Sequence, residues 1–458
     1  MSHQQISPST EVLFPSTTAW FNYMDPAIHA LTNDGQLQLV SNALKQLARS
    51  HGRSDLAVYH LAFDICSSKT DGKKAAKALL RKYPTNIELY IGYANYEFRA
   101  GNNAVASNVV TAALQLPSLS YEEKLQLSLA WAWMALEQGD LATSLSRLCL
   151  TGQETQSAIT EPASPALILK NPADPDLELR GNATVASLYA KALVLLQYLT
   201  QQSGKEPRGE GQGDIEAAMA VVAKCSDEFK ARGLAADAGH ERLLQFAAQL
   251  LYVHISHGPY RPAFLREQTA AFLGFFPDNT IFLTLFAWKE TRLGIDDRVR
   301  ALLTDVVLTK PHDCASARVF AIRHEMRSGN AHSTRAAFEH ALEDSPGCKH
   351  NAGMWVSYIR YCRETKELRP KAKEVFYRAI QRCPWSKEVF MEAFGTLVRD
   401  LDSAELRSVY STLYEKGVRV HVEMDEFVGR WKEEARQRDQ QRDQQSHSHR
   451  PAVGGGRR

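Results

Sequence analysis

The sequence lacks the features of a disulfide-rich, secreted or membrane-spanning protein. Its seven cysteines are scattered, form no Cys-x-x-Cys pair and are odd in number, which is typical of reduced thiols inside the cell. The longest apolar stretch, "LLQFAAQLLYVHI" at 243–255, is interrupted by glutamine and is too short to span a bilayer. The N-terminus has no basic segment followed by an apolar one, so no signal peptide is indicated. These absences predict a soluble intracellular protein.

An excess of positive charge is also lacking. The chain of 458 residues has 54 Lys and Arg against 52 Asp and Glu, a formal net charge of +2. The C-terminal tail, residues 432–458, carries +3 of this, which leaves the body at −1. A dedicated nucleic-acid-binding protein usually has a visible basic excess. The bulk charge therefore gives no support for nucleic-acid binding.

Catalytic and metal-binding motifs are missing as well. The sequence holds no Gly-x-Ser-x-Gly, no P-loop and no His-Glu-x-x-His. His254 and His257 lie three residues apart, but no nearby carboxylate or cysteine completes a ligand set. The Gly-x-Gly-x-Gly run at 209–213 follows no strand, so it does not indicate a phosphate site. We predict no enzyme, no cofactor, no bound metal and no small-molecule substrate.

What the sequence does have is helical periodicity. In "AKALLRKYP" (76–84) and "KEVFYRAIQRCP" (373–384), apolar residues recur three and four positions apart. No long alternating pattern indicates a strand, and glycine or proline closes the segments. The chain is therefore predicted to be all-α.

The helical segments also repeat. Glu290 and Glu325 lie 35 residues apart, and Pro346 and Pro384 lie 38 apart, which are the periods of helix-pair solenoids. Four prolines align, each with an apolar residue four positions earlier: Leu80 and Pro84, Leu273 and Pro277, Leu342 and Pro346, Ile380 and Pro384. We predict a right-handed α-solenoid of HAT/TPR-like helix-turn-helix repeats.

The pattern Glu-x-Arg-x-Gly occurs three times, at 97–101, 290–294 and 325–329. The glycine is expected at a helix C-terminus with positive φ, and the arginine in the last turn, where the helix dipole favours a cation. Glutamate and arginine two positions apart do not face each other, so the glutamate is expected to reach a neighbouring helix. A structural role is predicted for Glu97, Arg99, Gly101, Glu290, Arg292 and Gly294.

Composition predicts the organisation of the chain. Helical repeats are expected at 11–150 and 185–431, separated by a Pro/Ser-rich loop or linker at 151–184. Flexible segments are expected at 1–10 and 203–214, and the tail at 432–458 is expected to be disordered.

The stretch 366–382, "KELRPKAKEVFYRAIQR", leaves two interpretations open. Its basic residues and interleaved aromatics could contact RNA through Lys366, Arg369, Lys371 and Lys373. However, Phe376 and Ile380 fall in the apolar frame of the repeat, which favours a solvated basic face over an RNA site. The tryptophans, among them Trp131, Trp133, Trp288, Trp355 and Trp385, are predicted to be packing residues.

The region 354–394 resembles the half-a-TPR (HAT) pattern, in which an aromatic-rich first helix ends in glutamate. The matching positions are Trp355, Tyr358, Tyr361 and Glu364, followed by Val375, Phe376, Arg378, Ala379 and Pro384. The resemblance implies a scaffold in RNA processing, because HAT repeats occur almost solely in such proteins.

Several longer stretches resemble the nuclear-RNAi-defective-two (NRDE-2) family over nearly the whole chain, and the sequence looks like a fungal-type member. They include "LFPSTTAWFNYM", "AKALLRKYPTNIELYIGYANYEFRAGN" and "LSLAWAWMALEQGD". The most specific are the segment 286–302 and the dipeptide Pro384–Trp385; the former carries Trp288, Glu290, Arg292, Asp296, Asp297 and Arg298.

The family resemblance implies a nuclear protein without enzymatic activity, in small-RNA-directed silencing and RNA surveillance. The implied partners are the RNA helicase of the nuclear exosome and splicing factors. Family members usually carry a long N-terminal region that contacts the helicase. We expect this chain to lack that region, so no helicase-contacting residue is carried over.

The sequence thus predicts a non-enzymatic nuclear scaffold that binds protein partners over a curved helical-repeat surface. Two alternatives stay open. One is a direct RNA-binding module that uses the 366–382 stretch and the tail. The other is a general TPR-like protein adaptor unrelated to RNA.

Overall fold

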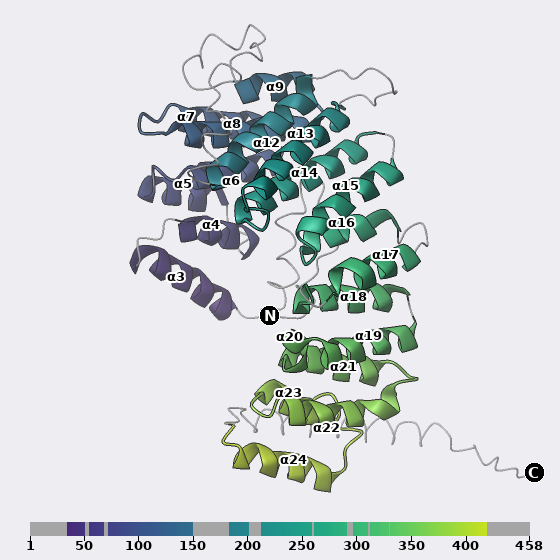
Figure 1. Cartoon of the computed structure of the whole chain (residues 1–458). Helices are drawn as coiled ribbons and strands as arrows, with labels where there is room; N and C mark the ends of the chain where they lie inside the picture. Colours follow the sequence, from purple (N-terminus) through teal and green to yellow (C-terminus); the bar gives the residue numbers. More distant parts are fainter. Residues whose placement is uncertain are drawn as a thin grey trace, which may run out of the picture. The chain divides into compact units, whose positions relative to one another are not determined.

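The structure is a computed structural model, which describes residues 34–50, 55–67, 72–149, 183–200, 212–258, 261–290, 296–309, 312–328 and 330–418. These residues form twenty α-helices, a π-helical turn and a 3₁₀ turn, and no strand (Figure 1). The prediction of an all-α fold is confirmed.

The chain divides into two compact units, Met1–Cys348 (unit 1) and Lys349–Arg458 (unit 2), each described here by itself. Unit 1 begins with α3 (Asp34–Ser50), α4 (Asp55–Ser67), α5 (Gly72–Lys82), α6 (Ile87–Arg99), α7 (Asn103–Leu114), α8 (Tyr121–Glu137) and α9 (Leu141–Cys149). It continues with α12 (Ala183–Thr200), α13 (Ile215–Ala231), α14 (Ala238–Ser256), α15 (Pro262–Phe275), α16 (Thr280–Glu290), α17 (Asp296–Leu302), η3 (Leu303–Val307), α18 (Ala315–Ser328) and α19 (Ala331–Asp344). A short helix, α20 (Pro346–Lys349), lies at the division between the units. Unit 2 holds α21 (Ala352–Glu364), η4 (Arg369–Lys371), α22 (Ala372–Arg382), α23 (Lys387–Phe394) and α24 (Ser403–Glu415).

Helices that are consecutive in the chain pack in pairs. In unit 1 the pairs include α6 with α7, α8 with α9, α12 with α13, α15 with α16 and α18 with α19. A second set of contacts joins one row of helices, in which each packs on the next: α4, α6, α8, α12, α14, α16 and α18. Pairing along the chain together with stacking between pairs is the arrangement of a helical-repeat array.

Helix ends follow the glycine signals in the sequence. Gly101 has φ +80°, and the N–H groups of Gly101 and Asn102 donate to the carbonyls of Phe98 and Glu97. This is a Schellman turn, which satisfies carbonyls that the helix leaves free. Gly139, Gly233 and Gly417 end their helices in the same way. The predicted positive φ is therefore confirmed at Gly101, whereas Gly294 lies outside the described residues.

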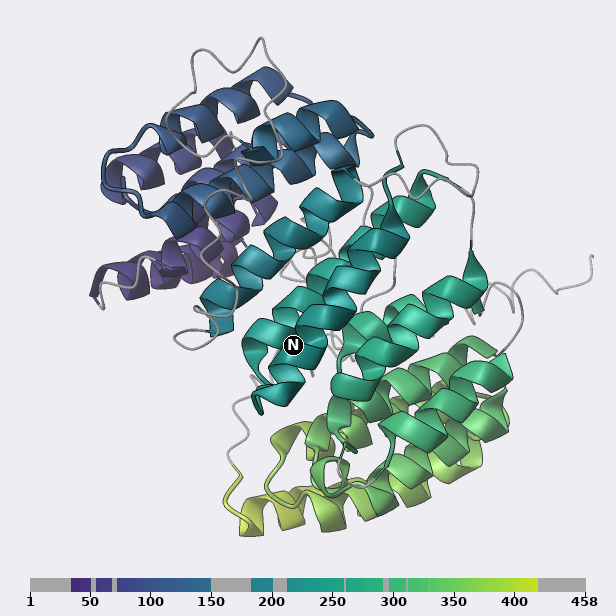
Figure 2. The same cartoon turned by 45° about the horizontal axis from the view of Figure 1, so that its top comes forward.

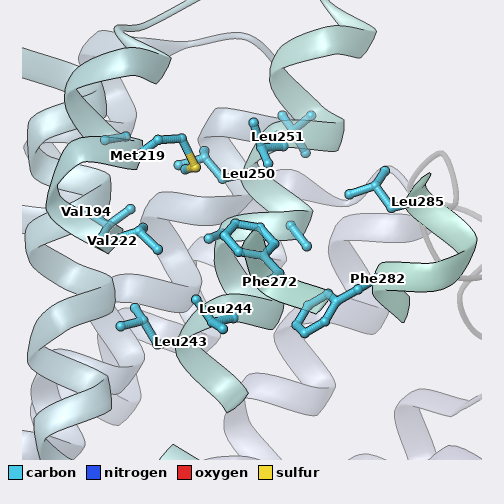
Figure 3. Packing of buried hydrophobic residues seen from close by; sticks show 14 of the residues in the cluster. Val194, Met219, Val222, Leu243, Leu244, Leu250, Leu251, Phe272, Phe282 and Leu285 are labelled. Atoms are coloured by element: carbon cyan, nitrogen blue, oxygen red, sulfur yellow. The ribbon is translucent and has the colours of Figure 1, made fainter. Parts of the chain in front are cut away.

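The largest apolar cluster of unit 1 runs from α8 to α18. Figure 3 shows part of it, including the buried side chains of Leu251, Phe272 and Phe282; the rings of Phe272 and Phe282 are tilted by 54°, with centroids 5.5 Å apart. The cluster includes Leu148, before the predicted linker at 151–184, and Ala186, after it. The residues on the two sides of that segment therefore share one core.

Helix α12 begins at Ala183, so it includes the last two residues of the predicted linker 151–184. It is the one described helix whose length and apolar composition would also suit a membrane span. Its buried residues, such as Val194, Leu195 and Tyr198, belong to the core cluster, as in the core helix of a globular protein.

Of the predicted flexible loop 203–214, the structure describes the last three residues, and these are buried. Gln212 donates to the carbonyl of His254, and Asp214 caps α13 by accepting from the N–H of Ala217. Between them, a Cβ atom on Gly213 would lie 2.1 Å from the carbonyl oxygen of Tyr198. Glycine is thus required here because two backbone segments approach closely, not because a phosphate is bound.

We predict that Gly213→Ala lowers the free energy of unfolding of unit 1 by about 2 kcal/mol or more, because the added methyl group must displace backbone. Gly274, in α15, is the matched control, since nothing lies within 4 Å of an added Cβ atom there. Gly274→Ala is expected to raise the free energy of unfolding by about 0.5–1 kcal/mol through helix propensity. Urea titrations followed by circular dichroism would measure both. Equal stability of the two variants would contradict this account of Gly213.

Unit 2 has its own set of fully buried large side chains, namely Trp355, Tyr358, Phe376 and Phe390. Phe376 is therefore a core residue, as its place in the repeat frame predicts. The frame is less accurate at the positions four residues before the prolines. Leu273 and Leu342 are buried, but Leu80 and Ile380 are only half-buried.

Six cysteines have described side chains, and all six are free thiols, five of them buried: Cys149, Cys225, Cys348, Cys362 and Cys383. Burial raises the pKa of Cys149 and of Cys225 to about 11. A thiol with such a pKa is a poor nucleophile and behaves as a small apolar side chain.

Candidate interaction surfaces

The first Glu-x-Arg-x-Gly pattern joins helices. The carboxylate of Glu97, fully buried on α6, lies 3.4 Å from the ammonium group of Lys73 on α5 and accepts from the amide of Asn102 at 2.8 Å. Arg99 interacts with Glu137 on α8, and burial lowers the pKa of Arg99 and raises that of Glu137. The pattern therefore connects α6 backward to α5 and forward to α8, which fixes the register of the array.

The third pattern repeats the backward connection. Glu325 on α18 accepts two hydrogen bonds from Arg300 on α17, at 2.7 and 3.0 Å. These bonds hold the pKa of Glu325 below its ordinary value. Glu392 on α23 accepts from Arg360 on α21 in the same manner, although the pattern is absent there. In the second pattern, the side chain of Glu290 and the residues Arg292 and Gly294 lie outside the described part.

The remaining family-motif residues of unit 1 also contact neighbouring helices. The ring of Trp288 on α16 lies 4.7 Å from that of Tyr252 on α14. Asp296, at the start of α17, lies 3.7 Å from the imidazole of His324. The exposed Asp297 pairs with Arg300 at 3.1 Å, and Arg298 is exposed.

In unit 2 the motif residues divide into a buried and an exposed group. Trp355 is buried, donates to the carbonyl of Lys349 and lies beneath the guanidinium of Arg378, 5.5 Å from the ring centre. Pro384 is half-buried, but Trp385 is 60% exposed, and its ring centroid lies 6.0 Å from that of His350. The prediction that Trp385 is a packing residue is wrong, because the turn after Pro384 directs its side chain outward.

Two of the four basic residues predicted to contact RNA are engaged in ion pairs. Arg369 lies 3.7 Å from Asp400, and Lys373 pairs with Glu405, which raises the pKa of Lys373. Lys366 is exposed and Lys371 half-buried. Partial neutralisation weakens the attraction of this face for phosphates.

The two histidines considered as metal ligands have other partners. The Nδ1 atom of His254 lies 3.0 Å from the hydroxyl of Tyr198, and that of His257 donates to the carbonyl of Val253. Within the residues searched, no group of three or more His, Cys, Asp or Glu side chains could hold a metal ion.

A concave site that the sequence analysis did not identify lies in unit 1, along the helix row α6, α8, α12 and α14. Helices α12 and α14 run side by side, with α8 against α12 (Figure 2). A cavity of about 460 Å³ opens between them, which is within the range of ligand-binding pockets. One wall is aromatic, because the rings of Trp133 and Phe246 meet with centroids 5.1 Å apart.

The site, which we call the inner pocket, contains two cations. Lys191 comes from α12 and Arg242 from α14. Burial and the charge of Arg242 lower the pKa of Lys191 to about 8. In the described part of the chain, neither cation has a carboxylate within ion-pair distance. The sequence offered one signal, a single lysine within the apolar stretch "SLYAKALVLLQYL", but nothing in it places Arg242 nearby.

We predict that Lys191→Met makes unit 1 more stable at pH 7, by about 1–2 kcal/mol, because it removes a poorly solvated charge beside another cation. Between pH 8 and 10.5 the folded chain has released the proton that the unfolded chain still holds, so the wild type gains stability as the pH rises. The advantage of the variant should therefore shrink by pH 10. Thermal melts at pH 7 and pH 10 measure it, with the exposed Lys224→Met as control. A Lys191→Met variant that melts lower than the wild type at pH 7 would contradict the prediction.

Comparison with known proteins finds relatives that share one name. No family model matches the chain. Two curated relatives named nuclear exosome regulator NRDE2, from Mus musculus and Homo sapiens, are each 23% identical to it, over 418 and 426 residues. Both alignments cover 78% of this chain and 34% of the relative, so the chain spans about a third of their length. A Dictyostelium discoideum protein of the same name is 32% identical over 108 residues, which is 23% of this chain and 8% of that protein. The matches agree in name, so the chain is similar over most of its length to proteins named NRDE2.

Proposed function

We propose that this chain is a non-enzymatic scaffold that acts in the nucleus, in the regulation of RNA surveillance by the exosome and in small-RNA-directed silencing. The observation that carries the proposal is its similarity, over most of its length, to proteins named nuclear exosome regulators. The proposed architecture is a right-handed solenoid of HAT/TPR-like repeats. Its partners would be proteins, among them the exosome helicase and splicing factors that the family resemblance implies.

The fold supports a scaffold. A stacked row of helices offers a long continuous surface, because no helix pair can bury its apolar face alone. The ion pairs Glu97–Lys73 and Glu325–Arg300, each with a largely buried carboxylate and a partly exposed cation, join successive helices, which supports one shape of such a surface. Glu97 and Glu325 are thereby engaged within the architecture, and the inner pocket offers a partner a concave site in the described part of unit 1.

Direct RNA binding receives less support. Arg369 and Lys373 are paired with carboxylates, and Phe376 lies in the core rather than on a stacking surface. A phosphate-binding stripe would need several free cations in sequence along the strand.

Affinity purification of the tagged chain from cells that express it, followed by mass spectrometry with and without nuclease, tests the proposal. Exosome cofactors or splicing factors should be recovered, and nuclease should not release them. Loss of every nuclear partner on nuclease treatment would favour the RNA-binding alternative. Exclusive residence of the tagged chain in the cytoplasm would favour a general adaptor and contradict the nuclear role.

A further inference from the structure

The inner pocket has an imbalance of charge that points to an acidic ligand. Lys191 and Arg242 repel each other, and Glu122 is the one carboxylate among the residues that line the pocket, so the lining carries a net positive charge. Holding an ammonium group in a half-buried place beside a guanidinium destabilises a protein unless something else needs it. Uncompensated charges of this kind are concentrated at binding sites, where the ligand supplies the missing charge.

The rest of the lining matches a polypeptide better than a nucleic acid. Asn95, Gln126 and Gln249 present amides, which can both donate to and accept from a peptide backbone. Glu122, in the same lining, can only accept while it is ionised, and a peptide supplies N–H donors for it. A phosphate group supplies hydrogen-bond acceptors and no N–H donor for Glu122. The ligand that fits all of these groups is a segment of protein.

The aromatic wall adds a second requirement. Trp133 and Phe246 lie in the same cavity as the two cations, so an apolar side chain beside the carboxylate would bury its surface against them. The cavity of about 460 Å³ has room for only a few side chains. An extended segment that alternates acidic and apolar residues would meet both requirements.

We propose that the inner pocket binds a short acidic segment of a partner protein, with Lys191 and Arg242 holding a carboxylate and Trp133 and Phe246 receiving an apolar neighbour. The inference rests on the proposed scaffold function, because it names the chemistry of the partner that the array would take. It assigns Lys191 and Arg242 a role in binding, whereas the ion pairs Glu97–Lys73 and Glu325–Arg300 join neighbouring helices.

A selection with a phage-displayed library of random decapeptides against the purified full chain tests the proposal. Sequences rich in aspartate or glutamate and in apolar residues should be enriched. The leading peptide, measured by calorimetry, should lose at least tenfold in affinity with Lys191→Met and with Arg242→Gln. The matched control Lys224→Met, exposed on α13 and away from the cavity, should bind as the wild type does. A peptide with asparagine and glutamine in place of its acids should not bind.

Three outcomes would overturn the inference. The selected peptides could show no enrichment of acidic residues, or the leading peptide could bind Lys191→Met as tightly as the wild type. The third is that a decamer of oligouridylate displaces the bound peptide at a lower concentration than the same peptide without its label does. The last would identify the pocket as a nucleic-acid site. The proposed function is judged separately, because the chain could still recover nuclear partners from cells through another surface while the library shows no acidic preference. Conversely, if acidic peptides are enriched but the tagged chain is found only in the cytoplasm, the binding role of the inner pocket stands and the nuclear role is rejected.

Discussion

Replacing Asp313 with alanine is expected to lower the free energy of unfolding of unit 1 by about 3–5 kcal/mol, among the largest effects of any single polar change. Asp313 precedes α18, and both of its carboxylate oxygens accept from the guanidinium of Arg318, at 2.8 and 2.7 Å. The two side chains are 8% and 9% exposed, and the pairing raises the pKa of Arg318. Removal of Asp313 leaves a buried arginine that keeps its charge at every accessible pH.

The double variant Asp313→Leu with Arg318→Met removes both charges, and so tests whether the loss in Asp313→Ala comes from the arginine left without its partner. Because a buried ion pair and apolar side chains of similar volume often give similar stability, the double variant should recover most of the loss. The control is Asp297→Ala, which breaks an ion pair at a 95% exposed carboxylate and should cost less than about 1 kcal/mol. Urea unfolding of the four proteins, followed by circular dichroism, gives the comparison. If Asp313→Ala and Asp297→Ala lose the same small amount, Asp313 does not hold a buried charge.

The sequence predicts what periodicity and local turn chemistry decide. The all-α fold, the burial of Phe376 and the positive φ of Gly101 all follow from spacings within one or two helices. The glutamate of the Glu-x-Arg-x-Gly pattern was predicted to reach another helix, because it cannot face the arginine two positions away, and Glu97 and Glu325 do so.

What the sequence could not predict depends on which distant helices meet. Lys191 and Arg242 belong to different helices, and only the packing of α12 on α14 brings them into one cavity. Trp385 is an example within a turn. The sequence places it directly after a proline, but the exposure of its ring depends on the packing around the turn. Leu80 and Ile380 are half-buried for the same reason, because the burial of an apolar position in a repeat depends on how the neighbouring helix packs against it.

Replacing Phe376 with alanine is expected to lower the free energy of unfolding of unit 2 by about 3–5 kcal/mol, the usual loss for a large aromatic truncated in a core. Phe376 on α22 is fully buried, among the large buried side chains of this unit. Its neighbour Tyr377 is 37% exposed and its hydroxyl lies 3.5 Å from the carboxylate of Glu405, so Tyr377→Ala should cost less than about 1 kcal/mol.

The two changes lie side by side in the basic stretch 366–382, and they distinguish a solvated face from an RNA-binding face. If Tyr377→Ala leaves stability unchanged but abolishes binding of oligouridylate in a salt-dependent assay, this face contacts RNA after all. If neither stability nor any measurable RNA binding changes with Tyr377→Ala, while Phe376→Ala unfolds unit 2 at lower urea, the aromatics of this stretch act in the core and the basic residues form a solvated face.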